Sequence, residues 1–173
     1  MTRIIALAAT AAVSLAAFAL AACGGGSNNA TGSAAAPKAP DGRPATVGVA
    51  NNGNLGKILD DSHGRTLYLF AKDSGIKSAC TGACASAWPP LRASGKPIVG
   101  AGASASIVGT TPRSDGQPQV TYKGHPLYTY TGDQNPGDTN GQGLTVFGGG
   151  WFVLSPVGDQ VSGTGSNGGA TGY

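Results

Sequence analysis

The sequence contains no glutamate and few charged residues of any kind. All eight acidic residues are aspartate, charged residues make up only 11% of the 173, and the formal net charge is +3. So small a positive charge excludes a basic nucleic-acid-binding protein. Because Glu is a strong helix former whereas Asp favours turns and helix ends, its absence argues against a helical fold.

Large aliphatic residues are also scarce, whereas glycine is abundant, with 30 Gly and 11 Pro in the chain. A low aliphatic content is typical of disordered chains, but those usually carry a high net charge as well. Both Trp residues, three of the four Phe and four of the five Tyr lie between Tyr68 and Phe152. Since aromatic side chains bury large areas, we expect one small all-β domain over residues 45–160.

The N-terminus has the plan of a secretory signal. Arg3 precedes the apolar run 4–20, and the run ends in Leu20-Ala21-Ala22-Cys23. This ending resembles the bacterial lipobox, which implies a signal peptide over 1–22, cleavage before Cys23 and acylation of its thiol by palmitate or a similar chain. The alternatives are an ordinary signal peptide and an uncleaved transmembrane helix.

Two low-complexity stretches flank the expected domain. The first, residues 23–44, begins with the lipobox cysteine and from Gly24 onward contains no aliphatic side chain larger than Ala. The second, residues 161–173, is rich in Gly, Ser and Thr. Such segments bury too little apolar surface to offset their ordering entropy. We therefore predict a flexible membrane tether and a disordered C-terminal tail.

Cysteine number fits a location outside the cytoplasm. With Cys23 assigned to lipid, Cys80 and Cys84 remain as an even pair, and a disulfide is the first expectation in an oxidising compartment. A redox-active or metal-binding pair is the alternative. The Cys-x-x-x-Cys spacing differs from the Cys-x-x-Cys of thioredoxin-like proteins.

An internal repeat organises the domain. Residues 64–73 align without gaps with residues 124–133, with Gly, Leu, Tyr and Asp identical. Each copy follows a strand-like run and a turn, so we predict two pseudo-equivalent antiparallel hairpin units, 45–92 and 106–160, joined by a linker over 93–105. Because each unit is too small to bury its own face, the two should pack on each other.

Strand periodicity separates the faces of the repeated segment. Tyr68 and Phe70 should lie on one side of the strand, and Leu67 and Leu69 on the other. In the second copy Tyr128 and Tyr130 match the aromatic pair. Asp73 and Asp133 follow three residues after the second aromatic residue, where the strand should have turned.

These residues carry a family resemblance. Tyr-x-aromatic-x-x-Asp occurs in both copies, with Cys-x-x-x-Cys before Trp88-Pro89-Pro90-Leu91 and Gly-Trp-Phe-Val at 150–153. The chain resembles the bacterial secreted-repeat lipoproteins named for the Tyr-x-(Phe/Trp/Tyr)-x-x-Asp motif. The resemblance covers nearly all of residues 45–160, but the biochemical role of that family is largely unassigned.

The motif residues are the candidate binding set. They form either a platform for a glycan, a peptide or an aromatic electron carrier, or the core of the domain, which we favour. The two Asp carboxylates are plausible acceptors for buried Tyr hydroxyls or for turn backbone N–H groups. The set comprises Tyr68, Phe70, Asp73, Trp88, Tyr128, Tyr130, Asp133 and Trp151.

Metal sites are a further hypothesis. The oxygen-rich segment 133–141 offers Asp133, Asn135 and Asp138 to calcium, although Asx-turns explain the same residues equally well. His63 and His125 offer imidazoles to copper or zinc. We expect no cofactor.

No catalytic motif stands out, so we predict a non-enzyme. The first hypothesis is a lipid-anchored module on the extracytoplasmic face of a bacterial membrane, which binds a cell-wall polymer or an envelope protein or has a structural role. The alternative is a redox or metal-handling accessory protein that uses Cys80, Cys84 and the aromatic set. Nucleic acid is not an expected partner.

Overall fold

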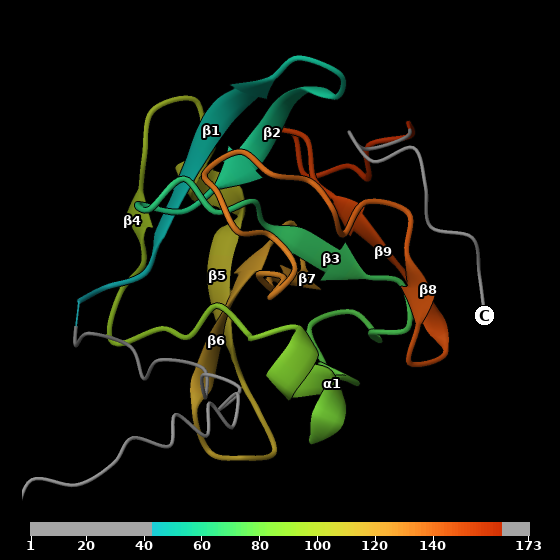
Figure 1. The fold of residues 1–173 in the computed structure, drawn as a ribbon. Helices are drawn as coiled ribbons and strands as arrows, with labels where there is room; N and C mark the ends of the chain where they lie inside the picture. The colour runs from blue at the N-terminus through green and yellow to red at the C-terminus, as the bar shows by residue number, and fades with distance from the viewer. Residues whose placement is uncertain (1–42, 164–173) are drawn as a thin grey trace, which may run out of the picture. The chain divides into compact units, whose positions relative to one another are not determined.

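The computed structural model describes residues 43–163, so the predicted signal peptide, Cys23, most of the tether and the last ten residues of the tail lie outside the described residues. The described part is built almost wholly from short strands, in agreement with the all-β prediction (Figure 1). Its helical elements are α1 (Ala83–Ala87) and a 3-10 turn (Ala105–Ile107). Neither these nor any other described segment forms a helix long and apolar enough to span a bilayer.

Three small sheets make up the described domain. The first has the order β2-β1-β4, with β1 (Thr46–Asn52) antiparallel to β2 (Gly56–Asp60) and parallel to β4 (Ile98–Val99). The second has the order β5-β6-β7, from β5 (Val108–Pro112), β6 (Pro118–Tyr122) and β7 (His125–Pro126). The segment expected as a linker, 93–105, thus contributes β4 to a sheet.

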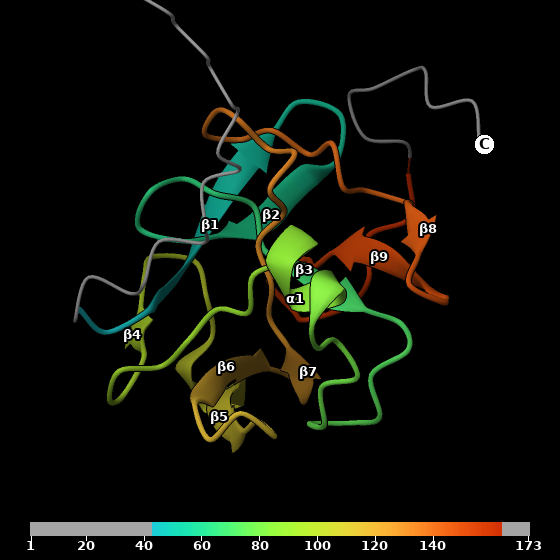
Figure 2. The same ribbon diagram turned by 60° about the horizontal axis from the view of Figure 1, so that its bottom comes forward.

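The third sheet joins the two repeats. Strand β3 (Tyr68–Phe70) belongs to the first repeat and pairs antiparallel with β9 (Gly149–Val153) of the second, and β8 (Thr145–Val146) completes the order β3-β9-β8 (Figures 1 and 2). In the register, Phe70 lies opposite Trp151.

Two backbone hydrogen bonds also join equivalent residues of the two repeats. The Tyr68 N–H donates to the Tyr128 carbonyl at 2.8 Å, and the Tyr128 N–H donates to the Tyr68 carbonyl at 3.0 Å. Equivalent residues of the two repeats therefore bind each other reciprocally, which places a local pseudo-twofold axis between them.

The hairpin predictions hold to different extents. The second hairpin forms as expected, because β6 turns through Lys123-Gly124 into β7. The first is held by the single Asp60–Thr66 bridge, with bonds from the Leu67 N–H to the Leu59 carbonyl and from the Asp61 N–H to the Arg65 carbonyl, since the full ladder of β2 is with β1. Strand β1 occupies one edge of β2, and at the other edge the Leu59 N–H donates to the Leu154 carbonyl of the second repeat, which limits the first hairpin to its single bridge.

The strand periodicity prediction is confirmed by two separate buried clusters. Leu67, Leu69 and Leu127 lie in an aliphatic cluster with Val47, Leu59 and Leu154 among others. Tyr68, Phe70 and Tyr128 lie in an aromatic cluster together with both Trp residues and both disulfide cysteines. Since neighbouring side chains of a strand point to opposite faces, the paired strands separate the two clusters.

Candidate functional site

The predicted aromatic residues form one continuous stack across the two repeats. Phe70 stacks on Trp151 with ring centroids 4.1 Å apart, Trp151 on Trp88 at 3.9 Å, and Trp88 on Tyr130 at 4.1 Å. Each inner ring also makes a perpendicular contact with a Tyr of its own repeat, Trp88 with Tyr68 and Trp151 with Tyr128. Offset stacking and edge contacts are the favoured geometries of aromatic pairs, so the stack stabilises the interface between the repeats.

This stack is inaccessible apart from one end. Tyr68, Trp88, Tyr128 and Trp151 are fully buried, and Phe70 is nearly so, whereas Tyr130 is half-buried. The rings lie in the core, the interpretation favoured from the sequence, and they do not form an open platform for a glycan or peptide.

Each motif Tyr binds the motif Asp of the other repeat. The Tyr68 hydroxyl donates to Asp133 Oδ2 at 2.7 Å, and the Tyr128 hydroxyl donates to Asp73 Oδ2 at 2.8 Å. Burying a hydroxyl without a partner is unfavourable, and the exchanged carboxylates supply that partner. The Tyr and Asp side chains of the motif therefore join one repeat to the other.

The same carboxylates also order the loops in which they lie. Asp73 Oδ1 accepts from the Ala79 N–H at 2.7 Å, and Asp133 Oδ1 accepts from the Asn140 N–H at 2.9 Å. The two roles considered for each Asp, acceptor for a Tyr and acceptor for turn backbone, are thus filled at once.

Burial shifts the titration of both pairs. Loss of water around the carboxyl raises the pKa of Asp133 to about 6 and raises the pKa of Asp73, despite the hydrogen bonds that both accept. The same loss of water, together with the partner carboxylate, raises the pKa of the Tyr68 and Tyr128 hydroxyls. Both tyrosines therefore stay protonated donors at physiological pH.

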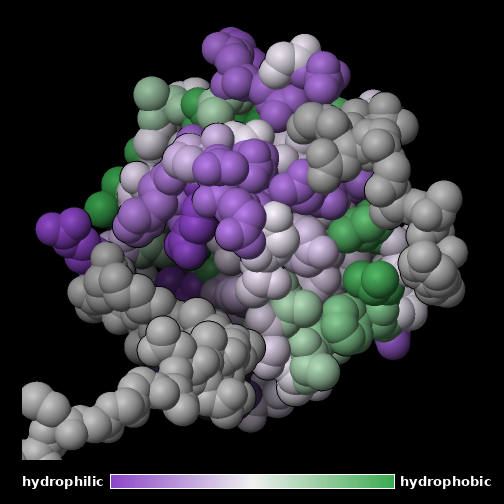
Figure 3. All heavy atoms as spheres, viewed as in Figure 1, coloured by the Kyte–Doolittle hydropathy of each residue, from purple (hydrophilic) through white to green (hydrophobic). Residues whose placement is uncertain are grey.

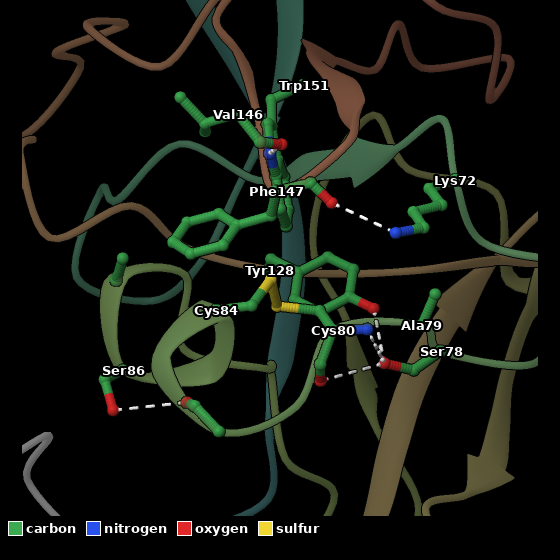
Figure 4. The surroundings of a disulfide bond; sticks show 12 residues. Lys72, Ser78, Ala79, Cys80, Cys84, Ser86, Tyr128, Val146, Phe147 and Trp151 are labelled. Carbon is green, nitrogen blue, oxygen red and sulfur yellow. Dashed lines mark hydrogen bonds between the residues drawn. A yellow bond between two sulfur atoms is a disulfide. The ribbon is translucent and has the colours of Figure 1, made fainter.

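A disulfide joins Cys80 and Cys84, as the even pair and the oxidising compartment suggested. Both cysteines are buried, and the bond closes the loop in which α1 begins, ahead of Trp88 (Figure 4). The Trp88 N–H then donates to the Cys84 carbonyl at 2.7 Å. The disulfide thus fixes the segment that carries one of the two stacked indoles.

A buried arginine that the sequence reasoning missed holds this loop from the other side. Arg113 donates through Nη2 to the Cys80 carbonyl at 2.7 Å and through Nη1 to Ser78 Oγ at 2.7 Å and Gln119 Oε1 at 2.8 Å. Ser78 Oγ lies 2.7 Å from the Tyr128 hydroxyl oxygen and donates to it, since the Tyr128 proton goes to Asp73 (Figure 4). Arg113, Ser78 and Gln119 therefore extend the Tyr128–Asp73 pair into a buried polar network.

No signal in the sequence separates Arg113 from an exposed turn residue, because it directly precedes Ser114 and the polar turn Asp115-Gly116. Its side chain is nevertheless buried, and Nε lies 3.2 Å from Asp115 Oδ2. Arg92 binds the same oxygen at 3.0 Å, and these two cations hold the pKa of Asp115 down to about 2.

The proposed calcium ligands are engaged in local turns. Asp138 Oδ2 accepts from the backbone N–H groups of Gln134 and Asn135, which precede it by four and three residues, whereas an Asx-turn would use the N–H two residues after it. Asp133 is committed to Tyr68 and Asn140. Within residues 43–163 no three His, Cys, Asp or Glu side chains come together as a metal cluster. His63 lies on the exposed turn beside Asp61 and His125 in β7, so the two predicted imidazole ligands lie on different elements.

Comparison with protein families gives one match. The model of a lipoprotein family described as a secreted repeat of unknown function matches the chain twice, over residues 49–92 and 109–155, which together exceed half of its length. The two matches fall on the two predicted repeats and confirm the resemblance drawn from the motif. No curated protein and no solved structure matches the chain.

Proposed function

We propose, from the premise that this chain belongs to the lipoprotein family of secreted repeats of unknown function, that it is a lipid-anchored, non-enzymatic module on the outer face of a bacterial membrane. Membership places the chain outside the cytoplasm. The anchor is the thiol of Cys23, and the module is the paired-repeat domain.

The observation that supports a binding or structural module is the exchanged pairing of Tyr68 with Asp133 and of Tyr128 with Asp73. Carboxylates that act as general acids or bases must reach a substrate. Here both are occupied by a hydroxyl and a backbone N–H of the domain itself. The Tyr and Asp residues of the repeated motif thus close the fold, and partners such as a wall polymer or an envelope protein must contact other surfaces.

Lipid anchoring is tested by metabolic labelling with a palmitate analogue in a bacterial host. The wild-type chain should incorporate label and fractionate with membranes. The Cys23→Ser variant should lose both properties, and Cys80→Ser with Cys84→Ser should keep both. Label that persists in Cys23→Ser would refute the anchor.

Partner binding is tested separately by photo-crosslinking on intact cells, with probes placed at exposed positions of the described domain. A reproducible crosslink to a wall polymer or an envelope protein supports the module. Purified domain that turns over a substrate, with loss of turnover in both Asp73→Asn and Asp133→Asn, would show an enzyme instead.

A redox role is the second candidate, because the Cys80–Cys84 disulfide lies in the same buried cluster as both indoles. Buried sulfurs exchange slowly with external thiols, which favours a structural bond. A reduction potential below about −300 mV would identify a structural disulfide, and a value near about −200 mV would favour redox exchange. Elemental analysis of the purified protein tests the metal-handling variant of this role.

A further inference from the structure

The hairpin between β8 and β9 presents an exposed aromatic side chain at its tip. Val146 and Phe147 are 40% and 44% exposed, although most large apolar side chains of the described domain are buried. The Phe147 ring extends beyond the hairpin on the side of α1 and the disulfide (Figure 4). The surface over this hairpin and α1 is largely apolar, in contrast to the polar surface above it (Figure 3).

This aromatic residue occupies an unfavourable backbone position. Phe147 has φ of 57° and Gly148 has φ of 84°, a succession of positive φ angles that two-residue hairpin turns usually fill with Asn-Gly or Gly-Gly. A bulky side chain is strained there. The other hairpin with this succession, Lys123-Gly124, places a polar residue at the same position. Because an exposed Phe at this position contributes strain, its presence points to a role outside the fold.

Positive charge lies beside the tip. Lys72 Nζ donates to the Phe147 carbonyl at 3.2 Å, and the loop that continues from Lys72 also carries exposed Ile76 and Lys77. The acidic residue of that loop, Asp73, is committed to Tyr128 and Ala79. The tip and its neighbouring loop thus combine apolar side chains with two lysines that form no ion pair within residues 43–163.

We propose that the β8–β9 tip inserts Phe147 and Val146 into the surface of an anionic phospholipid bilayer, with Lys72 and Lys77 at the headgroups. This combination of exposed aromatic, aliphatic and lysine side chains is the chemistry of interfacial membrane contact. The proposal rests on the lipid anchor proposed above, and it adds the face of the domain that meets the membrane.

The length of chain before the domain supports this occupant. Only the 20 residues Gly24–Arg43 separate Cys23 from the first strand region, so even a fully extended chain keeps the domain within roughly 70 Å of the acylated residue. A tethered domain of this kind meets the bilayer at an effective concentration on the order of millimolar. At that effective concentration a small apolar tip is sufficient to orient the domain.

The experiment uses the single thiol outside the disulfide. The chain from Cys23 to Tyr173, which retains every described contact, is coupled through Cys23 to maleimide lipid in phosphatidylglycerol vesicles that contain doxyl-labelled lipid. Phe147→Trp reports insertion of the tip by fluorescence quenching. Val157→Trp is the matched control, because Val157 is 63% exposed on a turn held against Lys123, away from β8.

We expect doxyl lipid to quench the Phe147→Trp signal at least threefold more than the Val157→Trp signal, after subtraction of the buried native indoles. Lys72→Gln with Lys77→Gln should remove most of that difference, as should vesicles of phosphatidylcholine alone. Equal quenching of the two reporters would overturn the proposal. A tip reporter that bilayer lipid does not quench, and whose fluorescence changes only when the protein density on the vesicle is raised, would also overturn it, because a second copy of the chain would then cover the tip. In this experiment Cys23 is joined to lipid chemically. The result therefore does not depend on whether Cys23 is acylated in cells, which the palmitate labelling tests separately.

Discussion

The Tyr68 hydroxyl lies 2.7 Å from Asp133 Oδ2, and the two residues belong to different repeats. The reciprocal pair, Tyr128 with Asp73, repeats this relationship about the local pseudo-twofold axis. A motif that reads in the sequence as a property of one repeat therefore acts only when two repeats meet. Neither repeat alone supplies the acceptor for its own buried hydroxyl, so we expect the domain to need both copies.

The pH dependence of stability should follow from Asp133. Its pKa of about 6 in the folded state lies above the ordinary value of 3.8, so the folded protein binds this proton more tightly than the unfolded chain does. The resulting stabilisation is complete below about pH 4 and is lost as the pH rises through 6. The pKa values of Asp73 and Asp60 are raised as well and contribute with the same sign.

We therefore expect the melting temperature to fall as the pH is raised from 4.5 to 7.5. This interval excludes the opposite contributions of Asp115 and Asp138, whose lowered pKa values act at more acid pH. Asp133→Asn should flatten the profile, and Asp159→Asn, at an exposed ion pair with Lys123, should leave its slope unchanged. A melting temperature that rises across the interval would contradict the assignment.

Arg113 should be far more important for stability than Arg92, although both bind Asp115. Arg113→Ala removes donors to Ser78, Gln119 and the Cys80 carbonyl inside the protein, and leaving such groups unpaired costs about 3 kcal/mol or more. Arg92→Ala removes one ion pair at a partly exposed site, worth about 1 kcal/mol or less. Chemical denaturation of the two variants measures the difference, and equal losses would show that the buried network contributes little.

Packing around the stack predicts a contrast between two glycines. A Cβ at Gly141 would lie 2.6 Å from Trp88 Cη2 and 3.0 Å from Tyr68 Cε1, whereas a Cβ at Gly53 meets nothing within 4 Å. Gly141→Ala should destabilise the domain by about 1–3 kcal/mol, because the rings have no free space to move into. Gly53→Ala should be neutral or slightly stabilising, since it lowers the entropy of the unfolded chain. Thermal unfolding of both variants checks the contrast.

The sequence predicted the faces of the repeated strand but not its partner. Alternation along the chain is local, so the sequence alone separates Tyr68 and Phe70 from Leu67 and Leu69. Pairing of β3 with β9 depends on contacts between residues more than 80 positions apart, and the first hairpin was expected to be more complete than it is, because β1 was not recognised as the partner of β2.

The candidate site shows the same division. Composition and spacing indicated the Tyr, Trp and Asp residues and the Cys80–Cys84 pair. Aromatic rings need burial, a buried hydroxyl needs an acceptor, and paired thiols oxidise outside the cytoplasm. The exchange between repeats was not visible, since both Asp residues are equivalent in the alignment. Arg113 was missed because its charge and its turn-like neighbours indicate exposure, whereas its burial depends on carbonyl and hydroxyl groups brought in from the Ser78–Cys80 segment.

The most direct test of the account is a double-mutant cycle on Tyr68→Phe and Asp133→Asn, followed by denaturant unfolding at pH 7.5. Exchange across the repeats predicts a coupling free energy of about 1–2 kcal/mol for this pair. The matched cycle, Tyr68→Phe with Asp73→Asn, pairs residues of the same repeat and should be additive within about 0.5 kcal/mol. Additivity in the first cycle, or an equal or larger coupling in the second, would contradict the conclusion that the motif joins one repeat to the other.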